Sequence, residues 1–319
     1  MSRGKGIFQN SLYFHFYKNQ EMQKPTTLKK GDKIAIVTTA RKATKEELQA
    51  GIALAESWGL EVVIGKSIGA EDHQFGGNDN LRAEDFQTQL DNPEVKAIWC
   101  ACGGYRTIRS IDKLDFSKFQ KNPKWIIGYS DVTVLHSHIH NLGVQTLHAQ
   151  MPVDIENKSK AAQESIRKVL FDEDYSINFS TNNRLDRGGT AEGILVGGNL
   201  SMLYSMCGSP TAIDTKDKIL FIEDLDEYLY HVDRMMQNLK RNGYFDSIKA
   251  LLVGGMTEMN DNAIPFGYTA QEIISHYIND KNIPLIFDFP AGHIKNNLAL
   301  PLGRKVQVGL REDYFTMRY

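Results

Sequence analysis

The chain has 319 residues, in which 37 Lys and Arg stand against 39 Asp and Glu, for a formal net charge of -2. A single hydrophobic core rarely organises so long a chain, so two domains are expected. The balanced charge provides no positive field to attract nucleic acid or an anionic membrane surface, and we expect neither as a partner. Hydrophobic residues make up 41% and charged residues 24%, which is typical of a globular protein and excludes a wholly disordered one.

The cysteines and the apolar runs indicate the cellular location of the protein. There are three cysteines, Cys100, Cys102 and Cys207, and the first two lack the C-x-x-C spacing of a redox or zinc motif. No apolar run approaches the roughly 20 residues of a membrane span, and the first 20 residues are too polar for a signal peptide. We therefore expect a cytoplasmic protein with reduced thiols. Residues 1–21 have no clear period and are interpreted as a possible N-terminal extension.

The first half of the chain alternates between predicted strands and predicted helices. Short apolar runs predict strands at Lys33–Thr39, Glu61–Gly65, Val95–Ala101 and Lys124–Gly128. Helical spacing of apolar residues predicts helices at Thr44–Trp58, Asn80–Leu90 and Val132–Asn141. This alternation is typical of an α/β fold with a doubly wound parallel sheet.

A polar stretch, Asp154–Arg187, separates this half from the next and contains one predicted helix, Ala161–Leu170. We predict an N-terminal α/β domain at residues 22–155, a linker at 156–187 and a C-terminal domain at 188–319. The predicted strands of the second domain are Thr190–Val196, Lys218–Ile222, Ile248–Val253 and Val306–Val308. Its predicted helices are Asn199–Met206, Tyr230–Asn242 and Thr269–Ile278.

Ser130 is a candidate nucleophile because of its place between a strand and a helix. Ligands of parallel sheets bind at the carboxyl ends of the strands, where helix N-termini converge. Ser130 lies at such a turn, in KWIIG-YSD-VTVLHS, and the turn resembles a nucleophile elbow without the G-x-S-x-G pattern. The alternative is a helix N-cap, a common structural role of serine.

Two later segments supply candidate partners for a nucleophile. The strand in KILFIEDLDE delivers Glu223 and Asp224 at its end, where a carboxylate can orient a histidine; the alternative is a solvated acidic loop. His293 lies in a loop bounded by Pro and Gly, where it is either a catalytic base or a structural residue. Three other histidines, His136, His138 and His140, are spaced by two on one predicted helix, so the three together cannot share a face as metal ligands. Four more histidines, His73, His148, His231 and His276, have no distinguishing local setting.

The segment CGGYR at Cys102–Arg106 ends a predicted strand with two glycines. Glycines let backbone N–H groups approach an anion closely, so this loop is a candidate oxyanion hole. A Gly-Gly pair is also common in ordinary tight turns.

Six segments, taken in order, resemble the LD-carboxypeptidase family, serine peptidases of the S66 type. They are GDKIAIV, AIWCACGGY, GYSDVT, GGNLSML, FIEDLDE and GHIKNNLALPLG. The similarity begins at Leu28 and extends over nearly all of the chain that follows.

The resemblance implies a catalytic triad of Ser130, Glu223 and His293, with no metal or cofactor. It also implies an N-terminal domain like flavodoxin or the glutamine amidotransferases, a smaller mixed α/β C-terminal domain, an active site at their junction and a homodimer. An oxyanion hole is expected from the backbone N–H groups of Gly104 and Asp131. The residues alone leave open which of Glu223, Asp224 and Glu227 faces the histidine, and the family pattern selects Glu223.

One departure concerns the residue after G-G-Y, which is usually glycine in that family and is Arg106 here. Arginine adopts positive φ less easily than glycine, so either the loop is reshaped or Arg106 supplies positive charge for a substrate carboxylate. We therefore treat Tyr105 and Arg106 as candidate substrate-binding residues.

The resemblance leaves three candidate functions for the protein. The first is hydrolysis of the L,D-amide bond that releases terminal D-alanine from murein tetrapeptides in cell-wall recycling, with a muropeptide as substrate. The second is the microcin C immunity type of peptidase, which cleaves aminoacyl-nucleotide amides and needs an aromatic platform for the base. The third is a non-catalytic protein that binds muropeptides.

Overall fold

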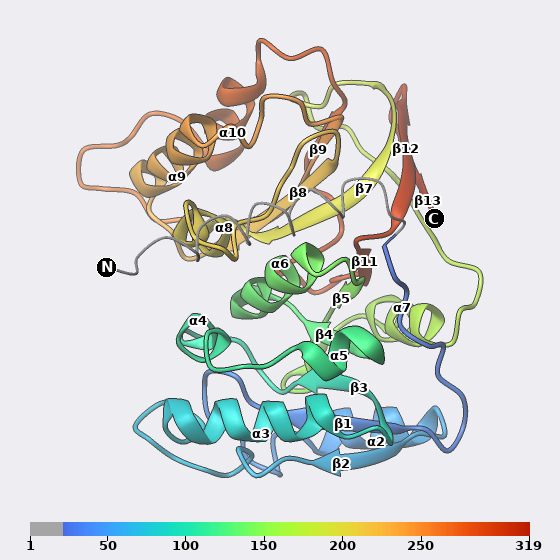
Figure 1. Cartoon of the computed structure of the whole chain (residues 1–319). Helices are drawn as coiled ribbons and strands as arrows, with labels where there is room; N and C mark the ends of the chain where they lie inside the picture. The colour runs from blue at the N-terminus through green and yellow to red at the C-terminus, as the bar shows by residue number, and fades with distance from the viewer. Residues whose placement is uncertain (1–21) are drawn as a thin grey trace, which may run out of the picture.

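The computed structural model describes residues 22–319, so the possible N-terminal extension at residues 1–21 lies outside the described residues. The chain forms two α/β halves, one built on each of two sheets (Figure 1). In the lower half of Figure 1 helices flank the first sheet, and the second sheet lies above it with α8, α9 and α10 on one side.

The first sheet has six strands in the order β11-β5-β4-β3-β1-β2. Its strands are β1 (Lys33–Val37), β2 (Glu61–Ile64), β3 (Val95–Cys100), β4 (Trp125–Gly128), β5 (Thr146–His148) and β11 (Leu300–Leu302). Strands β1 to β5 are parallel, and β11 adds to the edge antiparallel to β5. The order β2-β1-β3-β4-β5 is that of flavodoxin-like folds and confirms the expected N-terminal architecture.

The helices of this half begin and end at residues suited to those places. They are α2 (Gln49–Ser57), α3 (Asp79–Asp91), α4 (Thr107–Ile111), α5 (Ser117–Lys121) and α6 (Thr133–Asn141), with a 3₁₀ turn, η1, at Ser130–Val132. The Asn78 side chain accepts a hydrogen bond from the N–H of Leu81 and caps α3. Gly59, with φ of 84°, takes the left-handed conformation that ends α2.

The second sheet has seven strands in the order β10-β9-β8-β7-β12-β13-β6. They are β6 (Ser176–Ser180), β7 (Gly189–Asn199), β8 (Ile219–Leu225), β9 (Ala250–Thr257), β10 (Leu285–Ile286), β12 (Lys305–Arg311) and β13 (Tyr314–Arg318). Strands β7 to β10 are parallel and the others antiparallel, which gives the expected mixed sheet. The remaining helices are η2 (Ile155–Asn157), α7 (Lys160–Leu170), α8 (Leu200–Met206), α9 (Leu229–Arg241) and α10 (Ala270–Ile278).

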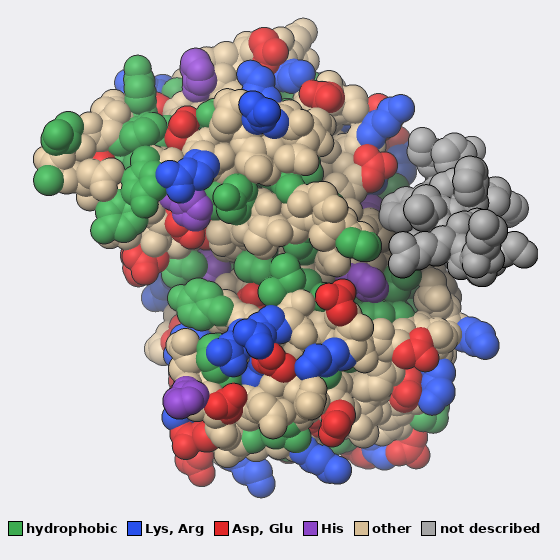
Figure 2. All heavy atoms as spheres, turned by 60° about the vertical axis from the view of Figure 1, so that its left-hand side comes forward, with side chains coloured by type: hydrophobic (Ala, Val, Ile, Leu, Met, Phe, Trp, Pro, Cys, Tyr) green, Lys and Arg blue, Asp and Glu red, His purple; other side chains and the backbone are tan. Residues whose placement is uncertain are grey.

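Helix α6 joins the two halves. Its apolar residues Val134, Leu135 and Ile139 belong to one continuous hydrophobic cluster that includes β3 and β4 on one side and β7, β8 and α8 on the other. Figure 1 shows α6 between the first sheet and α8. Figure 2 shows that the surface is hollowed beneath the overhanging upper half, at the left-hand edge of the view. The element that follows Ser130 is therefore buried at the junction of the two sheets.

The structure differs from the sequence expectations mainly in short edge elements. Segment 156–187, expected to be a linker, contains β6 at the edge of the second sheet as well as the expected helix α7. Strand β11, within the expected C-terminal domain, pairs with the first sheet. The expected helix at Thr44–Trp58 begins only at Gln49, although Thr44 and Glu47 exchange the hydrogen bonds of a capping box. The domain boundaries stay a prediction.

Candidate active site

Ser130 lies on a tight, strained turn between β4 and α6. Strand β4 ends at Gly128, Tyr129 is extended, and Ser130 has φ of 62°. A serine in this left-handed region is uncommon and costs on the order of 1 kcal/mol or more, which is tolerated where surrounding structure enforces it. The strand, the sharp turn and the helix together have the form of a nucleophile elbow rather than that of an ordinary N-cap.

His293 and Glu223 form a buried pair. Oε2 of Glu223 lies 2.6 Å from Nδ1 of His293 and accepts a second hydrogen bond from the His293 backbone N–H at 3.1 Å. Glu223 lies within β8 and is fully buried, so the alternative of a solvated acidic loop is wrong. The close approach depends on Gly292, with φ of 100°, because a Cβ there would lie 2.7 Å from Oε2 of Glu223.

The electrostatics of this pair favour the charged form of both groups. Burial by itself lowers the pKa of His293, but the charge of Glu223 and the hydrogen bond to it outweigh burial and raise that pKa above its usual value. Burial by itself raises the pKa of Glu223, and His293 lowers it below its usual value. A carboxylate on Nδ1 fixes the tautomer that leaves Nε2 as the proton acceptor.

Tyr129 connects the serine turn to the histidine. Its ring centroid lies 4.7 Å from that of His293, and it directly precedes Ser130. Among the described residues, no hydrogen bond joins the Ser130 hydroxyl to His293. The triad implied by the resemblance requires this hydrogen bond, which in unliganded enzymes is often long and tightens only with substrate.

The glycine loop lies against Ser130. A Cβ on Gly103 would lie 3.0 Å from Oγ of Ser130, so only glycine leaves this much space beside the hydroxyl. Gly104 has φ of 137°, and within residues 22–319 neither Gly103 nor Gly104 donates its backbone N–H in a hydrogen bond. Sequence reasoning selected Gly104 and passed over Gly103, whose contact with Ser130 depends on the meeting of two separate strand ends.

The Asp131 side chain ties the serine turn to this loop. Its Oδ2 accepts hydrogen bonds from the N–H of Thr107 at 2.9 Å and from the Thr107 hydroxyl at 2.7 Å. Burial raises the pKa of Asp131 to about 6. Its backbone N–H belongs to the first turn of η1, where N–H groups lack intrahelical partners. Through its side chain, Asp131 fixes the start of α4 next to the turn that carries Ser130.

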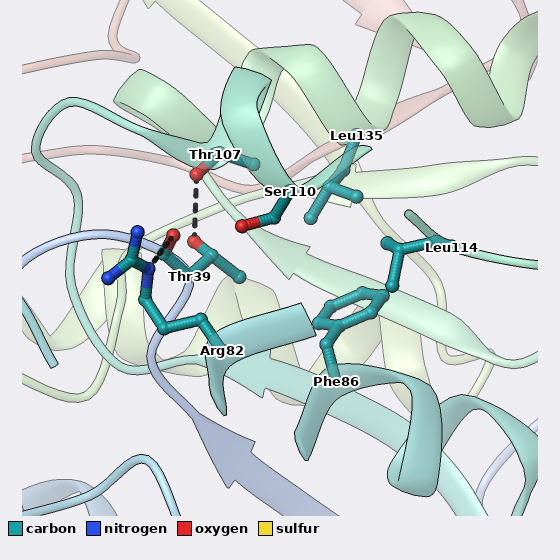
Figure 3. Close-up of a pocket in the computed structure, with 7 residues that line it drawn as sticks. All are labelled: Thr39, Arg82, Phe86, Thr107, Ser110, Leu114 and Leu135. Carbon is teal, nitrogen blue, oxygen red and sulfur yellow. Dashed lines mark hydrogen bonds between the residues drawn. The ribbon is translucent and has the colours of Figure 1, made fainter. Parts of the chain in front are cut away.

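Figure 3 shows the small cavity beneath the start of α4. The Thr39 hydroxyl lies 3.0 Å from the Thr107 hydroxyl, to which it can donate, and Nε of Arg82 donates to the Thr39 carbonyl at 3.2 Å. Ser110 also lines the cavity, and its buried hydroxyl has no hydrogen-bond partner among the described residues. None of the predicted site residues lines this cavity, so it supports the loop rather than holding the reacting groups.

Arg106 has a backbone conformation that is typical of glycine. Its φ is 144°, so the arginine occupies a glycine-like conformation. The guanidinium carbon lies 3.7 Å from the centre of the Phe75 ring, and one of its nitrogens lies 4.0 Å from Asp79. The neighbouring Tyr105 is 70% exposed. Both candidate substrate-binding residues thus lie at the tip of the glycine loop, with Arg106 held by Phe75.

Two other acidic residues were alternatives to Glu223, and neither bonds to His293. Asp224 is buried and accepts hydrogen bonds from Asn199 and Ser201. Glu227 lies beyond the end of β8, and its Oε2 is 2.6 Å from Nδ1 of His231. The structure therefore selects Glu223 as the partner of His293.

His148 is a neighbour of the site that the sequence did not single out. It ends β5, pairs in register with Gly128, and its ring centroid lies 5.8 Å from that of Tyr129. Burial lowers its pKa to about 4, so it is neutral at pH 7. The available signal was its position at the carboxyl end of a short apolar run, which is a weak one.

The histidines, cysteines and acids of residues 22–319 are the possible ligands of a metal centre. Within residues 22–319, no three His, Cys, Asp or Glu side chains gather in a way that could hold a metal ion. His136 is buried, with Nε2 2.9 Å from the Gly128 carbonyl. No helix in the described part of the chain is long and apolar enough to cross a membrane.

Comparison with known proteins assigns the family. Residues 34–149 match the LD-carboxypeptidase N-terminal domain, and residues 192–308 match the LD-carboxypeptidase C-terminal domain. The chain is 35% identical to a probable murein peptide carboxypeptidase of Bacillus subtilis, over 91% of this chain and 92% of that protein. It is 29% identical to the microcin C7 self-immunity protein of Escherichia coli, over 86% and 91% of the two chains.

A solved structure agrees with these sequence matches. The muramoyltetrapeptide carboxypeptidase from Oxalobacter formigenes superposes with a TM-score of 0.81 at 28% identity, over 89% of this chain and 97% of that one. Both halves of the fold and nearly the full length of the relatives are thus accounted for. The chain belongs to the LD-carboxypeptidase family of serine-type peptidases and is a hydrolase.

Proposed function

We propose that the protein is a serine carboxypeptidase that hydrolyses the L,D-amide bond and releases terminal D-alanine from murein tetrapeptides, as part of cell-wall recycling. The observation that carries the proposal is the buried Glu223–His293 pair beside the strained turn of Ser130. The relatives named as murein peptide carboxypeptidases support the choice of substrate.

The proposed reaction is an acyl transfer in two stages. Nε2 of His293 accepts the Ser130 proton as Oγ attacks the amide carbonyl, and Glu223 stabilises the imidazolium that forms. The tetrahedral oxyanion accepts hydrogen bonds from the N–H groups of Gly104 and Asp131, a contribution of about 3 to 4 kcal/mol per donor. The C–N bond then breaks as His293 gives its proton to the D-alanine nitrogen, and water hydrolyses the acyl-enzyme by the same route.

The glycine loop offers a charge for the substrate carboxylate. A terminal D-alanine carries a carboxylate next to the scissile bond, and an arginine can bind it through two parallel hydrogen bonds. Arg106 lies two residues beyond Gly104, and its guanidinium rests on Phe75 and makes only a long ion pair, at 4.0 Å, with Asp79. We assign Arg106 to this carboxylate, with the exposed Tyr105 beside it.

The microcin C immunity type of activity is the second candidate, favoured by the similarity to the self-immunity protein. It needs an aromatic platform for a nucleobase. All three tryptophans, Trp58, Trp99 and Trp125, are buried in the core of the first half, where they cannot provide one. Tyr105, which is exposed on the glycine loop, could still stack on a base, so the comparison of substrates below decides between the two activities. The third candidate, a protein that only binds muropeptides, does not explain a strained serine beside a buried Glu–His pair.

The test compares two substrates under the same conditions. Purified protein is incubated with a murein tetrapeptide and with an aminoacyl-nucleotide amide, and free D-alanine and free amino acid are measured. We expect D-alanine release with a kcat/KM at least tenfold above that for the nucleotide amide. The reverse preference would assign the immunity type of activity, and binding of the tetrapeptide without any cleavage would assign the third function. The homodimer and the cytoplasmic location stay predictions.

A further inference from the structure

Strand β8 ends with a second buried carboxylate that the reaction above does not use. Asp224 is 1% exposed, and its Oδ1 accepts hydrogen bonds from Nδ2 of Asn199 at 2.8 Å and from the N–H of Leu225 at 2.9 Å. Its Oδ2 accepts from the N–H of Ser201 at 2.8 Å. Asp224 therefore fixes the junction at which β7 ends and α8 begins.

That junction contacts the helix that follows the nucleophile. The backbone N–H of Asn199 donates to the Thr133 hydroxyl at 3.0 Å, and Thr133 is the first residue of α6, three positions after Ser130. The preceding Gly198 has φ of 143°, and a Cβ there would lie 2.5 Å from Oγ1 of Thr133. Only glycine allows this approach. Figure 1 shows α6 directly beneath α8 and β7.

The chain of contacts links the turn that carries Ser130 to the strand that carries Glu223. Ser130 belongs to the first sheet, whereas Glu223 belongs to the second, and Asn199 pairs in register with Glu223. Catalytic groups on separate elements must be held within about 0.5 Å of the productive geometry. A continuous path of hydrogen bonds from Asp224 through Asn199 to Thr133 provides such a constraint.

We propose that Asp224 is a positioning residue that, through Asn199 and Thr133, fixes the turn carrying Ser130 relative to the strand carrying Glu223. This inference rests on the proposed function for its meaning in catalysis. The substitution that tests it is Asp224→Asn, which keeps the size of the side chain. Its amide has a single acceptor oxygen, which cannot replace both Oδ1, the acceptor for Asn199 and Leu225, and Oδ2, the acceptor for Ser201, so at least one contact is lost.

The charge of Asp224 gives a second effect that a purely structural residue would lack. The groups that face it are Glu223 on its own strand, Asn199 and Ser201 at the β7–α8 junction, and His293 from the loop after β10. Burial, and then Glu223, raise the pKa of Asp224 to about 7, and its charge in turn helps to raise the pKa of His293. Removal of the charge is expected to lower the pKa of His293.

The experiment measures kinetics and two substrate-free signals. In Asp224→Asn we expect kcat for D-alanine release to fall about 10- to 100-fold with KM within twofold, because a displacement near 1 Å has effects of this size. In the double variant Asn199→Asp with Asp224→Asn, the amide at 224 donates to the carboxylate at 199, which restores this contact. The carboxylate at 199 still accepts from the N–H of Met202 and caps α8. We expect the double variant to recover most of the lost kcat.

The matched control is Asn141→Ala at the far end of α6. Nδ2 of Asn141 donates across the same junction to the carbonyls of Pro210 and Ala212, far along the helix from Ser130. We expect a kcat close to that of the wild type. An Asp224→Asn variant with unchanged kcat, a folded double variant without recovery, or an equal loss in Asn141→Ala would each overturn the proposal.

Nuclear magnetic resonance separates this inference from the proposed function. In substrate-free protein, Asp224→Asn is expected to shift the backbone amide signals of Ser130 and Thr133 and to lower the pKa of His293, whereas Asn141→Ala does neither. If the wild-type protein releases no D-alanine, the proposed function fails, and these signals alone test the positioning role of Asp224. Unchanged signals in Asp224→Asn would overturn the positioning role.

Discussion

Nδ1 of His293 lies 2.6 Å from Oε2 of Glu223. Glu223 lies in β8, and His293 lies 70 positions later, in the loop after β10. The carboxylate also accepts the His293 backbone N–H, so both the ring and its loop are held by one oxygen. This arrangement leaves Nε2 as the free nitrogen of the imidazole. It is the geometry that the proposed general base requires, and in the proposed mechanism Glu223 is an orienting group rather than a proton carrier.

The first prediction concerns Glu223→Gln. The amide keeps the shape of the side chain but removes the charge, so kcat is expected to fall about 10³- to 10⁴-fold, as when a triad acid becomes an amide elsewhere. The pKa of His293 falls as well, because Glu223 raises it in the native protein. The base must be neutral, so the acidic limb of the kcat/KM profile moves to lower pH. An acidic limb at the wild-type position would contradict this account.

The second prediction separates strain from chemistry at Ser130. Both Ser130→Ala and Ser130→Gly remove the proposed nucleophile, and both are expected to be inactive. With φ of 62°, alanine keeps the strain whereas glycine relieves it, so Ser130→Gly should be more stable than Ser130→Ala by about 1 kcal/mol. Urea denaturation measures the difference. A glycine variant clearly less stable than the alanine variant would show that the turn is not strained.

The third prediction concerns Arg106 and the substrate carboxylate. Arg106→Ala is expected to raise KM for the tetrapeptide about tenfold or more, because the carboxylate loses its charged partner. Arg106→Lys keeps a charge but not the paired donors, and we expect an intermediate KM. Steady-state kinetics on tetrapeptides with and without an amidated terminus check the assignment. An unchanged KM in Arg106→Ala would remove Arg106 from the binding site.

The fourth prediction is a pH effect on stability. The pKa of Asp131 is about 6 in the folded protein, above the value near 4 of an unfolded chain, so folding favours the protonated form. Stability is therefore lost as pH rises from about 4 to about 6, and the loss is complete above the folded pKa.

Asp131→Asn provides the comparison for this effect. The amide oxygen can still accept from Thr107, while the charge is absent. The free energy of unfolding of Asp131→Asn, relative to the wild type, should rise by about 2 kcal/mol between pH 4.5 and pH 7.5. Denaturation at both values measures it. A constant difference between the two proteins would mean that Asp131 does not titrate as described.

Much of the fold follows from local patterns in the sequence. Buried runs such as Val95–Cys100 are apolar except for Lys96, and Gly59 and Asn78 mark helix ends by their own chemistry. Short strands carry no such signal. β5 has three residues and β11 has three, and each is a strand only because a neighbouring strand supplies hydrogen bonds. Pairing between distant segments cannot be derived from local periodicity.

The candidate site, like the fold, could be predicted from the sequence only in part. The position of Ser130 after an apolar strand and the acidic end of β8 were visible in the residues, but the choice between Glu223 and Asp224 depended on resemblance. The structure gives the reason: the missing side chain of Gly292 admits the carboxylate of Glu223 beneath His293. The contacts of Gly103 and His148 with this region arise from the arrangement of neighbouring strands, which no single segment encodes.

The most direct test of the central claim is release of free D-alanine from a purified murein tetrapeptide by the wild-type protein and by Ser130→Ala. The account predicts release by the wild type and a loss of about 10⁴-fold or more in the variant, which should remain folded because alanine keeps the same backbone. Release at an unchanged rate by Ser130→Ala would contradict the assignment of the nucleophile, and no release by either protein would contradict the carboxypeptidase function.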